Sequence, residues 1–307
     1  MVRLVVDIGG TYMRLALSEN GESFVSDPQK IKTDQFLSFE DSLLRFVQTE
    51  KYNQQDITSI SVAKSGQNKW EVDETIVAKS FPCAQFAIVN DFEANAMGLV
   101  HVAPDELIHL GGKKLAPDAG LPRAVIGSGT GLGLAYIGRN GDVQATHGGH
   151  MRPALISPDQ IDLFADLQYF KTDGTIPIYE DALSGNGVLN IYKILSGRRH
   201  LDCEYHDTHH MLSEGRNNPL VQMTLKYYHE ILGQFAHQVV AFGGAYGGLF
   251  LTGGVTDRLM VHGLFDKDSF FAGFYQKNVP VVQADVLSTP VFWVKDEFIS
   301  LKGLLSN

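Results

Sequence analysis

The sequence has few of the residues that fix several common classes of protein. Only two cysteines, Cys83 and Cys203, occur in 307 residues, too few for a disulfide framework or a four-cysteine zinc site. No run approaches the roughly 18 apolar residues that a membrane-spanning helix needs. The 25 basic residues are outnumbered by 35 acidic ones, and the net charge of −10 repels phosphate backbones and anionic membrane surfaces. We therefore expect a cytoplasmic protein with no nucleic-acid partner and no membrane partner.

Composition and periodicity indicate a globular α/β protein. Hydrophobic residues make up 44% of the chain and charged residues 20%, and 307 residues are more than one core usually holds, so we expect two lobes. In the first part, apolar alternation and helical periodicity predict strands at 2–8, 12–18, 22–31 and 57–63 and a helix at 35–50. Strands followed by helices are typical of α/β layers.

The second half is richer in helices and contains an internal echo of the first. A long amphipathic segment at 219–242 leads into a predicted strand at 248–254. The segments "DIGGTYMRLALSENGE" (7–22) and "GSGTGLGLAYIGRNGD" (127–142) both place a glycine-rich turn and a threonine before a strand that ends in Asn-Gly and an acid. Two copies of one unit predict two related lobes, with a ligand held by both turns in the cleft between them.

The glycine-rich turns suggest phosphate binding. Asp7 precedes Gly9, Gly10 and Thr11, where bare amides and a hydroxyl can approach phosphate oxygens and the carboxylate can hold hydrated Mg²⁺. An ordinary hairpin turn explains this motif equally simply. The second turn makes phosphate binding the better hypothesis, and its candidate residues are Gly127, Gly129, Thr130 and Gly131.

Standard nucleotide motifs fit these turns poorly. The second turn has Leu132 where a dinucleotide-binding fingerprint needs its last glycine, and "GGKK" at 111–114 lacks the earlier glycine of a P-loop. Protein-kinase and hydrolase motifs are also missing. Arg14, on the strand after the first turn, suits a local carboxylate as well as a phosphate. The phosphate-binding hypothesis thus needs a different fold.

A second candidate site follows the segment "AIVNDFEANAMG" (87–98). Asn90 can cap a helix that begins there, with Glu93 completing a capping box. Asp91 is equally well placed as a catalytic base, because it projects from the end of a strand. The two interpretations are compatible.

Taken in order, these motifs resemble those of the bacterial glucokinases. The residues that carry the resemblance are Asp7-x-Gly9-Gly10-Thr11, Asn90-Asp91, Gly127-x-Gly129-Thr130-Gly131-x-Gly133, Gly149-His150, Glu180-x-x-Leu183-Ser184-Gly185 and Gly253-Gly254. The resemblance implies an ATP-dependent hexose kinase of the actin-like ATPase (ribonuclease H-like) superfamily. It also implies a small lobe at 1–106 plus 290–307 and a large lobe at 107–289, each a five-stranded mixed sheet with helices around a cleft, and a homodimer.

The resemblance assigns roles to individual residues. It implies that phosphates and Mg²⁺ are bound by Asp7, Gly9, Gly10 and Thr11. Phosphates are also expected to contact Gly127, Gly129, Thr130 and Gly131, and adenosine is expected to contact Gly253 and Gly254. The sugar falls to Asn90, Asp91, His150 and Glu180, with Asp91 as the base for the 6-hydroxyl. These roles suit phosphoryl transfer, which depends on positioning and charge stabilisation.

Two departures from the family leave the sugar open. His147 stands where the family has a glutamate beside the sugar, so an acceptor-only carboxylate is replaced by a donor and acceptor. The stretch 66–90 is shorter and lacks the family's proline and Thr-Asn…Trp segments. Glucose is the leading candidate, and an amino, anhydro or larger sugar is the alternative. A non-catalytic sensor of the same fold is a second alternative, which the presence of both Asp7 and Asp91 disfavours.

The segment "ATHGGHMRP" (145–153) carries both histidines. A metal clip is the weakest interpretation, because no cysteine or carboxylate set accompanies them and magnesium prefers oxygen ligands. We expect Gly148 and Gly149 to let this loop approach the ligand closely.

Overall fold

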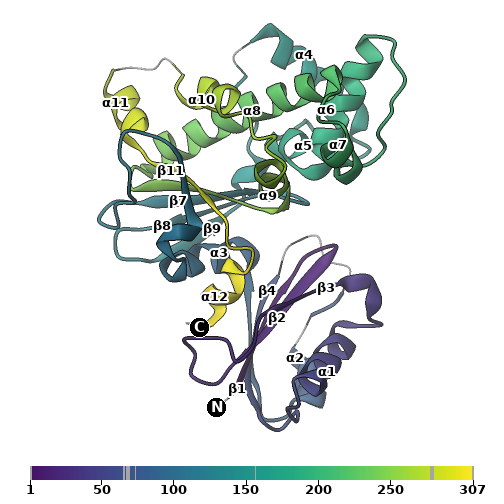
Figure 1. Cartoon of the computed structure of the whole chain (residues 1–307), viewed down its shortest axis with the longest axis vertical. Coiled ribbons are helices and arrows are strands. Elements are labelled where there is room, and N and C mark those ends of the chain that lie inside the picture. Colours follow the sequence, from purple (N-terminus) through teal and green to yellow (C-terminus); the bar gives the residue numbers. More distant parts are fainter. Residues whose placement is uncertain are drawn as a thin grey trace. The chain divides into compact units, whose positions relative to one another are not determined.

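The chain folds into two α/β units. The computed structural model describes residues 2–64, 66, 70–72, 74–155, 157–276 and 280–305. Unit 1 comprises Met1–Glu106 and Asp296–Asn307, and unit 2 comprises Leu107–Lys295, so the purple N-terminal strands and the yellow C-terminal helix of Figure 1 belong to the same unit. The chain returns to unit 1 at Asp296, later than the 290 expected, because residues 291–294 pair within the sheet of unit 2.

Unit 1 is built on a five-stranded mixed sheet in the order β3-β2-β1-β4-β5. The first three strands form an antiparallel meander, and β4 and β5 run parallel to β1. The strands are β1 (Val2–Ile8), β2 (Tyr12–Ser18), β3 (Gln29–Lys32), β4 (Ile57–Lys64) and β5 (Gln85–Asn90).

Side-chain alternation in β1 separates the two faces of this sheet. Leu4, Val6 and Ile8 pack in one buried cluster with residues of α1 (Phe39–Thr49) and α2 (Glu74–Ser80). Val5 packs in another cluster, formed with α3 (Asp91–Gly98) and α12 (Ile299–Leu305). Asp7 therefore lies on the α3 and α12 face.

Two glycines let α3 and α12 touch. A Cβ on Gly98 would lie 2.0 Å from the carbonyl oxygen of Ile299, and one on Gly303 would lie 2.0 Å from that of Ala94. Any side chain at either position would push the helices apart. This close contact carries the C-terminal segment of the chain onto the face where Asp7 lies.

Local hydrogen bonds shorten two elements relative to their predicted ranges. The helix predicted at 35–50 begins at Phe39, because Ser38 Oγ accepts a bond from the Asp41 amide at 3.0 Å and caps it. The strand predicted at 22–31 is confined to β3, because Asn20 Oδ1 accepts bonds from the amides of Glu22 and Ser23 and folds that stretch into a turn.

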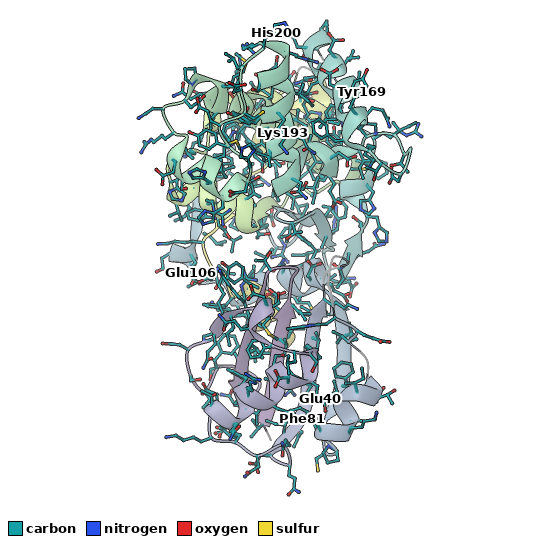
Figure 2. All side chains as sticks on the ribbon, turned by 90° about the vertical axis from the view of Figure 1, so that its right-hand side faces the viewer. Glu40, Phe81, Glu106, Tyr169, Lys193 and His200 are labelled. Atoms are coloured by element: carbon teal, nitrogen blue, oxygen red, sulfur yellow. The ribbon has the colours of Figure 1, made fainter. Side chains whose placement is uncertain are left out.

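The stretch 66–90, where the sequence departs from the family, contains α2. Ser80 Oγ donates a hydrogen bond to Glu40 of α1, and Phe81 is fully buried behind them; Figure 2 labels Glu40 and Phe81 in this part of unit 1. Residues 67–69 and 73 of this stretch lie outside the described residues.

Unit 2 repeats the topology of unit 1 and adds a strand. Its sheet has the order β6-β11-β10-β7-β8-β9, with an antiparallel meander β7-β8-β9 and two strands, β10 and β11, parallel to β7. The strands are β6 (Leu107–Gly111), β7 (Arg123–Ser128), β8 (Leu132–Ile137), β9 (Val143–Thr146), β10 (Gly248–Thr252) and β11 (Val291–Val294). The expected five strands become six because β6 pairs antiparallel with β11.

The long helix α8 (Pro219–Gly243) is accompanied in unit 2 by shorter helices. They are α4 (Pro158–Leu167), α5 (Tyr179–Leu183), α6 (Gly185–Arg198), α7 (Thr208–Glu214), α9 (Gly254–Val261), α10 (Lys267–Phe274) and α11 (Pro280–Ser288). Gly233 and Gly273 let α8 and α10 meet backbone to backbone, since a Cβ on either would lie within 2.1 Å of a carbonyl oxygen. Among the described residues, no helix is long and apolar enough to cross a membrane.

The predicted strand at 248–254 ends early. Gly253 has φ +96°, which ends β10 at Thr252 and starts α9 at Gly254. The two glycines that the sequence analysis assigned to adenosine thus form a strand-to-helix turn.

Candidate active site

The acidic end of β1 is held by two partners. Asp7 Oδ2 accepts hydrogen bonds from Arg14 Nη1 at 3.1 Å and from Ser300 Oγ at 2.7 Å. Arg14 lies directly opposite Asp7 in the β1–β2 register, so the arginine pairs with a local carboxylate. Both bonds fall on one oxygen, which fixes the Asp7 side chain.

Some polar groups of the turn after Asp7 are bonded within the protein. The Gly9 amide donates to the Tyr12 carbonyl at 3.0 Å, and the Gly10 and Thr11 carbonyls accept from Thr33. These bonds fix the backbone of the turn. The amides of Gly10 and Thr11 and the exposed Thr11 hydroxyl are then the donors suited to an anion.

Asn90 and Asp91 have separate tasks at the start of α3. Asn90 Oδ1 accepts bonds from the Phe92 and Glu93 amides, so Asn90 caps the helix. Asp91 is the first helical residue and its Oδ1 accepts from the Phe92 amide at 3.0 Å. The Asn90 side-chain oxygen is thus committed to the backbone, and the Asp91 carboxylate is the group at this junction that suits acid–base chemistry.

The pKa of Asp91 is raised to about 6, first by burial and then by the charge of Asp7, against the lowering effect of the Phe92 amide. A carboxylate whose ionisation is made more costly by burial and by a nearby carboxylate is typical of a site that handles protons or binds a cation. A carboxylate with this pKa is ionised near neutral pH and still accepts a proton readily.

The second glycine turn is tied into unit 2 from several sides. The Gly129 amide donates to the Gly131 carbonyl at 2.9 Å, and the Gly129 carbonyl accepts from the Gly185 amide at 2.8 Å. A Cβ on Gly129 would lie 3.8 Å from the Gly254 amide nitrogen, and one on Gly253 would lie 2.5 Å from the Ser128 carbonyl oxygen. The structure therefore brings together the turn at 129–131 and Gly253–Gly254.

Two helices begin at this turn. Gly185 opens α6 and Gly254 opens α9, and both adjoin Gly129. Helix N-termini carry free amides and partial positive charge, so this part of unit 2 suits the phosphates of a nucleotide. Thr130 is exposed at the tip of the turn.

A buried tyrosine lies beneath the same turn. The pKa of the fully buried Tyr228 phenol is raised by burial, while the hydroxyls of Ser128 and Thr256 act in the opposite direction. Ser128 ends β7, just before the turn, and its Oγ donates to the Leu183 carbonyl. Thr256 lies in the first turn of α9. The Tyr228 phenol thus lies next to both elements that form the glycine site.

The three expected sugar residues of unit 2 lie together. Glu180 Oε2 accepts from the Leu132 amide at 2.8 Å, and its Oε1 lies 3.9 Å from His150 Nε2. The His147 and His150 rings are stacked, with centroids 5.7 Å apart and planes 13° from parallel. An acceptor and two imidazoles form a group that can exchange paired hydrogen bonds with a polyol.

Gly148 and Gly149 serve the fold in a way that the sequence did not suggest. Both are buried, and a Cβ on Gly148 would lie 2.2 Å from the Leu134 side chain, while one on Gly149 would lie 2.0 Å from the Leu132 carbonyl oxygen. Their missing side chains let the loop approach β8 closely. That contact sets the two histidines beside Glu180.

The donor sets fit hydrated magnesium better than a directly bound transition metal. Across the residues that the structure describes, no cluster of three or more His, Cys, Asp or Glu side chains could hold a metal ion. Asp7, whose Oδ2 is held by Arg14 and Ser300, offers a single carboxylate, which fits an ion that keeps most of its waters. The histidines His147 and His150 belong to no such cluster among the described residues.

Comparison with known proteins identifies the family. The family model described as Glucokinase matches residues 4–306. The chain belongs to the glucokinase family. It is therefore a sugar phosphotransferase. Among curated relatives, the glucokinase of Chromohalobacter salexigens is 29% identical and aligned over 84% of this chain and 83% of its own. A glucokinase-like protein of Xylella fastidiosa is 28% identical over 83% and 80%.

Solved structures agree on the fold. The glucokinase of Balamuthia mandrillaris, determined in complex with glucose, superposes with a TM-score of 0.82 at 21% identity, covering 99% of this chain and 92% of its own. A glucokinase from an Antarctic psychrotroph superposes with a TM-score of 0.77 at 24% identity, covering 99% and 98%. The two-lobed α/β fold expected from the sequence is confirmed.

Several residues that shape the site were missed by sequence reasoning. Ser300 lies 293 residues from Asp7 and belongs to no local motif, so only the packing of α12 reveals it. Thr33 and Tyr228 likewise act across elements. Gly185 stood inside a recognised motif, and its position right after Ser184, the cap of α6, was the available signal.

Proposed function

We propose that this protein transfers the γ-phosphoryl group of ATP to the 6-hydroxyl of a hexose, with Asp91 as the general base. The observation that supports this most directly is the half-buried Asp91 carboxylate beside Asp7, with its pKa raised to about 6. Membership of the glucokinase family supplies the reaction class. Glucose is the first sugar to test.

The phosphate-binding groups divide between the two units. We assign the Gly10 and Thr11 donors of unit 1, and the turn Gly129–Thr130–Gly131 with the α6 and α9 N-termini of unit 2, to the phosphates of ATP. Gly253 and Gly254 would lie against the adenosine. Magnesium held through water at Asp7 would supply charge neutralisation on the transferred phosphates.

The proton and bond changes follow from this arrangement. Asp91 orients the sugar hydroxyl and accepts its proton as the hydroxyl oxygen bonds to the γ-phosphorus. The bond between that phosphorus and the β,γ-bridging oxygen breaks, and ADP leaves with the electron pair. His150 and Glu180 hold the ring hydroxyls, and Asn90 fixes the start of α3 so that Asp91 keeps its direction.

The decisive experiment combines product analysis with one substitution. ADP release is measured with ATP and Mg²⁺ across glucose, mannose, fructose, N-acetylglucosamine and anhydro sugars, and the phosphorylated position is assigned by NMR. We expect a 6-phosphate with the wild type and a severe loss of turnover with Asp91→Asn, while ATP still binds. Full activity of Asp91→Asn would remove the proposed base.

The proposal extends to the setting of the enzyme. A hexose 6-phosphate is the product expected of a kinase that feeds glycolysis in the cytoplasm, and the net charge of −10 disfavours nucleic-acid partners. The homodimer implied by the family resemblance can be checked by light scattering at several protein concentrations.

A further inference from the structure

Unit 2 contains an apolar pocket next to the His147 loop. The pocket measures about 550 Å³, which is within the range of small-molecule sites. Its walls come from β8, the 148–151 loop and the last turns of α8. The apolar side chains that line it are Leu134, Tyr136, Met151, Ala241 and Phe242.

The polar groups at this pocket are mostly occupied by the protein. The Tyr136 hydroxyl donates to the Val239 carbonyl at 3.0 Å, and Gln238 Nε2 donates to the Tyr179 hydroxyl at 2.8 Å. His237 Nδ1 lies 2.8 Å from the Phe274 carbonyl oxygen. A ligand that fills this space would therefore meet apolar surface.

His147 joins the pocket to the proposed sugar group. Its side chain lines the pocket, and its ring stacks on His150, which lies 3.9 Å from Glu180. The same face of β8 carries Leu132, Leu134 and Tyr136, which are two residues apart along the strand. The Leu132 amide donates to Glu180, and the other two side chains line the pocket. The sugar group and the pocket are thus neighbours along one strand.

We propose that the pocket receives an apolar substituent of the sugar, so that the preferred substrate is a hexose carrying an acyl or alkyl chain of several carbons. This inference rests on the proposed sugar site at His150 and Glu180. His147 then separates the polar sugar site from the apolar pocket. An imidazole suits that boundary, because it offers one hydrogen bond to the linking group and an apolar ring face to the chain.

The proposal commits to a small-molecule substituent over a protein partner. Phe242 is 90% exposed at the rim, which a dimer could also cover. The hollow itself, however, is lined mainly by apolar side chains and adjoins His147, and an apolar pocket beside a ligand site is the usual form of a specificity pocket. A second copy of the chain is the competing outcome.

Chain-length series test the proposal. The catalytic efficiency, kcat/KM, and the binding affinity by calorimetry are measured for N-acyl glucosamines from acetyl to hexanoyl and for alkyl glucosides from methyl to hexyl, with glucose as reference. We expect at least one series to gain with length, by up to about fourfold for each methylene that is buried. Efficiency and affinity that stay flat or fall with length in both series would overturn the proposal.

Three variants test whether a gain with substituent length comes from this pocket. Ala241→Trp fills the pocket, and we expect it to abolish the preference for long chains over glucose. Lys226→Trp adds the same indole to an exposed part of α8 and should leave that preference intact. Phe242→Ser, on the exposed rim, should weaken the preference without threatening the fold. If the wild type and the three variants show the same preference for long substituents, the substituent binds elsewhere and the assignment is overturned.

The remaining outcomes separate this inference from the proposed function. If no sugar is phosphorylated but affinity still rises with chain length and falls in Ala241→Trp, the kinase proposal fails and the pocket stands. If glucose is phosphorylated with no gain from any chain, and Phe242→Ser converts a dimer to a monomer, the pocket is an interface between copies and the inference fails.

Discussion

The turns after β1 and β7 occupy equivalent places in two sheets that share a topology, yet the residues beside them differ. Beside the first turn, the facing pair across the two strands is Asp7 and Arg14. Beside the second, it is Gly127 and Gly133. The same hairpin thus holds a charged pair in one unit and bare backbone in the other. The fold provides two similar hairpins, and the residues at these positions place a carboxylate in unit 1 and leave the backbone of unit 2 open to close approach.

Removing the acid of unit 1 should have the greatest effect on activity. Asp91→Asn is expected to lower kcat by roughly 10² to 10⁴, the usual contribution of a general base. It should also stabilise the folded chain by about 2 kcal/mol above pH 6. The reason is that the folded-state pKa is raised from 3.8 to about 6, so the wild type loses stability as pH rises through that window. Kinetics and thermal unfolding at pH 5 and 8 measure both effects.

The wild-type pH profile provides the control for that variant. The activity of the wild type should fall below about pH 6 as Asp91 is protonated, and Asp7→Asn should move this limb to lower pH, because it removes the neighbouring charge. If the acid limb of the activity profile does not move, the charge of Asp7 has no effect on the ionisation of Asp91.

The bare backbone of unit 2 is tested by a pair of neighbouring glycines. Gly253→Ala is expected to cost about 1–3 kcal/mol, because φ is +96° and the new Cβ would lie 2.5 Å from the Ser128 carbonyl oxygen. Gly254→Ala has open space and should change the free energy of unfolding by less than about 0.5 kcal/mol. If nucleotide lies here, Gly254→Ala still raises the KM for ATP. Denaturant titration and ATP kinetics distinguish the two effects, and equal destabilisation would contradict the assignment.

A buried histidine gives unit 2 a pH response opposite to that of Asp91. His229 is fully buried, and burial lowers its pKa from 6.5 to about 4. The unfolded chain therefore binds a proton first as pH falls, and up to about 3 kcal/mol of stability is lost between pH 6.5 and 4. His229→Gln should flatten this acid limb in thermal unfolding. An unchanged limb would assign the acid sensitivity to other groups.

The final comparison concerns two ion pairs of unit 1. Lys302 Nζ lies 2.7 Å from Asp296 Oδ2 and 3.3 Å from Glu106 Oε2, the residues where the chain enters and leaves unit 1; Figure 2 labels Glu106. Because Asp296 is buried, Lys302→Met should cost about 2 kcal/mol. The matched change Lys30→Met, which breaks an exposed pair with Glu297, should cost no more than about 0.5 kcal/mol. Urea titrations at low and high salt compare them, and equal costs would show that burial of Asp296 is unimportant.

Much of the fold could be predicted from local sequence. β1 and β2 begin and end where alternation predicted, and the echo between 7–22 and 127–142 corresponds to the meanders β1-β2-β3 and β7-β8-β9. Elements shifted where side chains competed for the backbone, as Ser38 and Asn20 do. The added strand β6 escaped prediction because its pairing with β11 joins residues far apart in the chain.

The sequence by itself determined the elements and the residue types at the candidate site. The spacing of the motifs predicts acids and glycines at strand ends, where their chemistry suits the binding of protons, cations or phosphates. Only the tertiary structure decided which side chains meet. It brings Ser300 into hydrogen-bond contact with Asp7, buries Asp91 so that its pKa rises, and places His147 at the apolar pocket. The reason is that burial, like-charge proximity and the shape of a pocket depend on groups brought together from distant segments, and no local pattern encodes them.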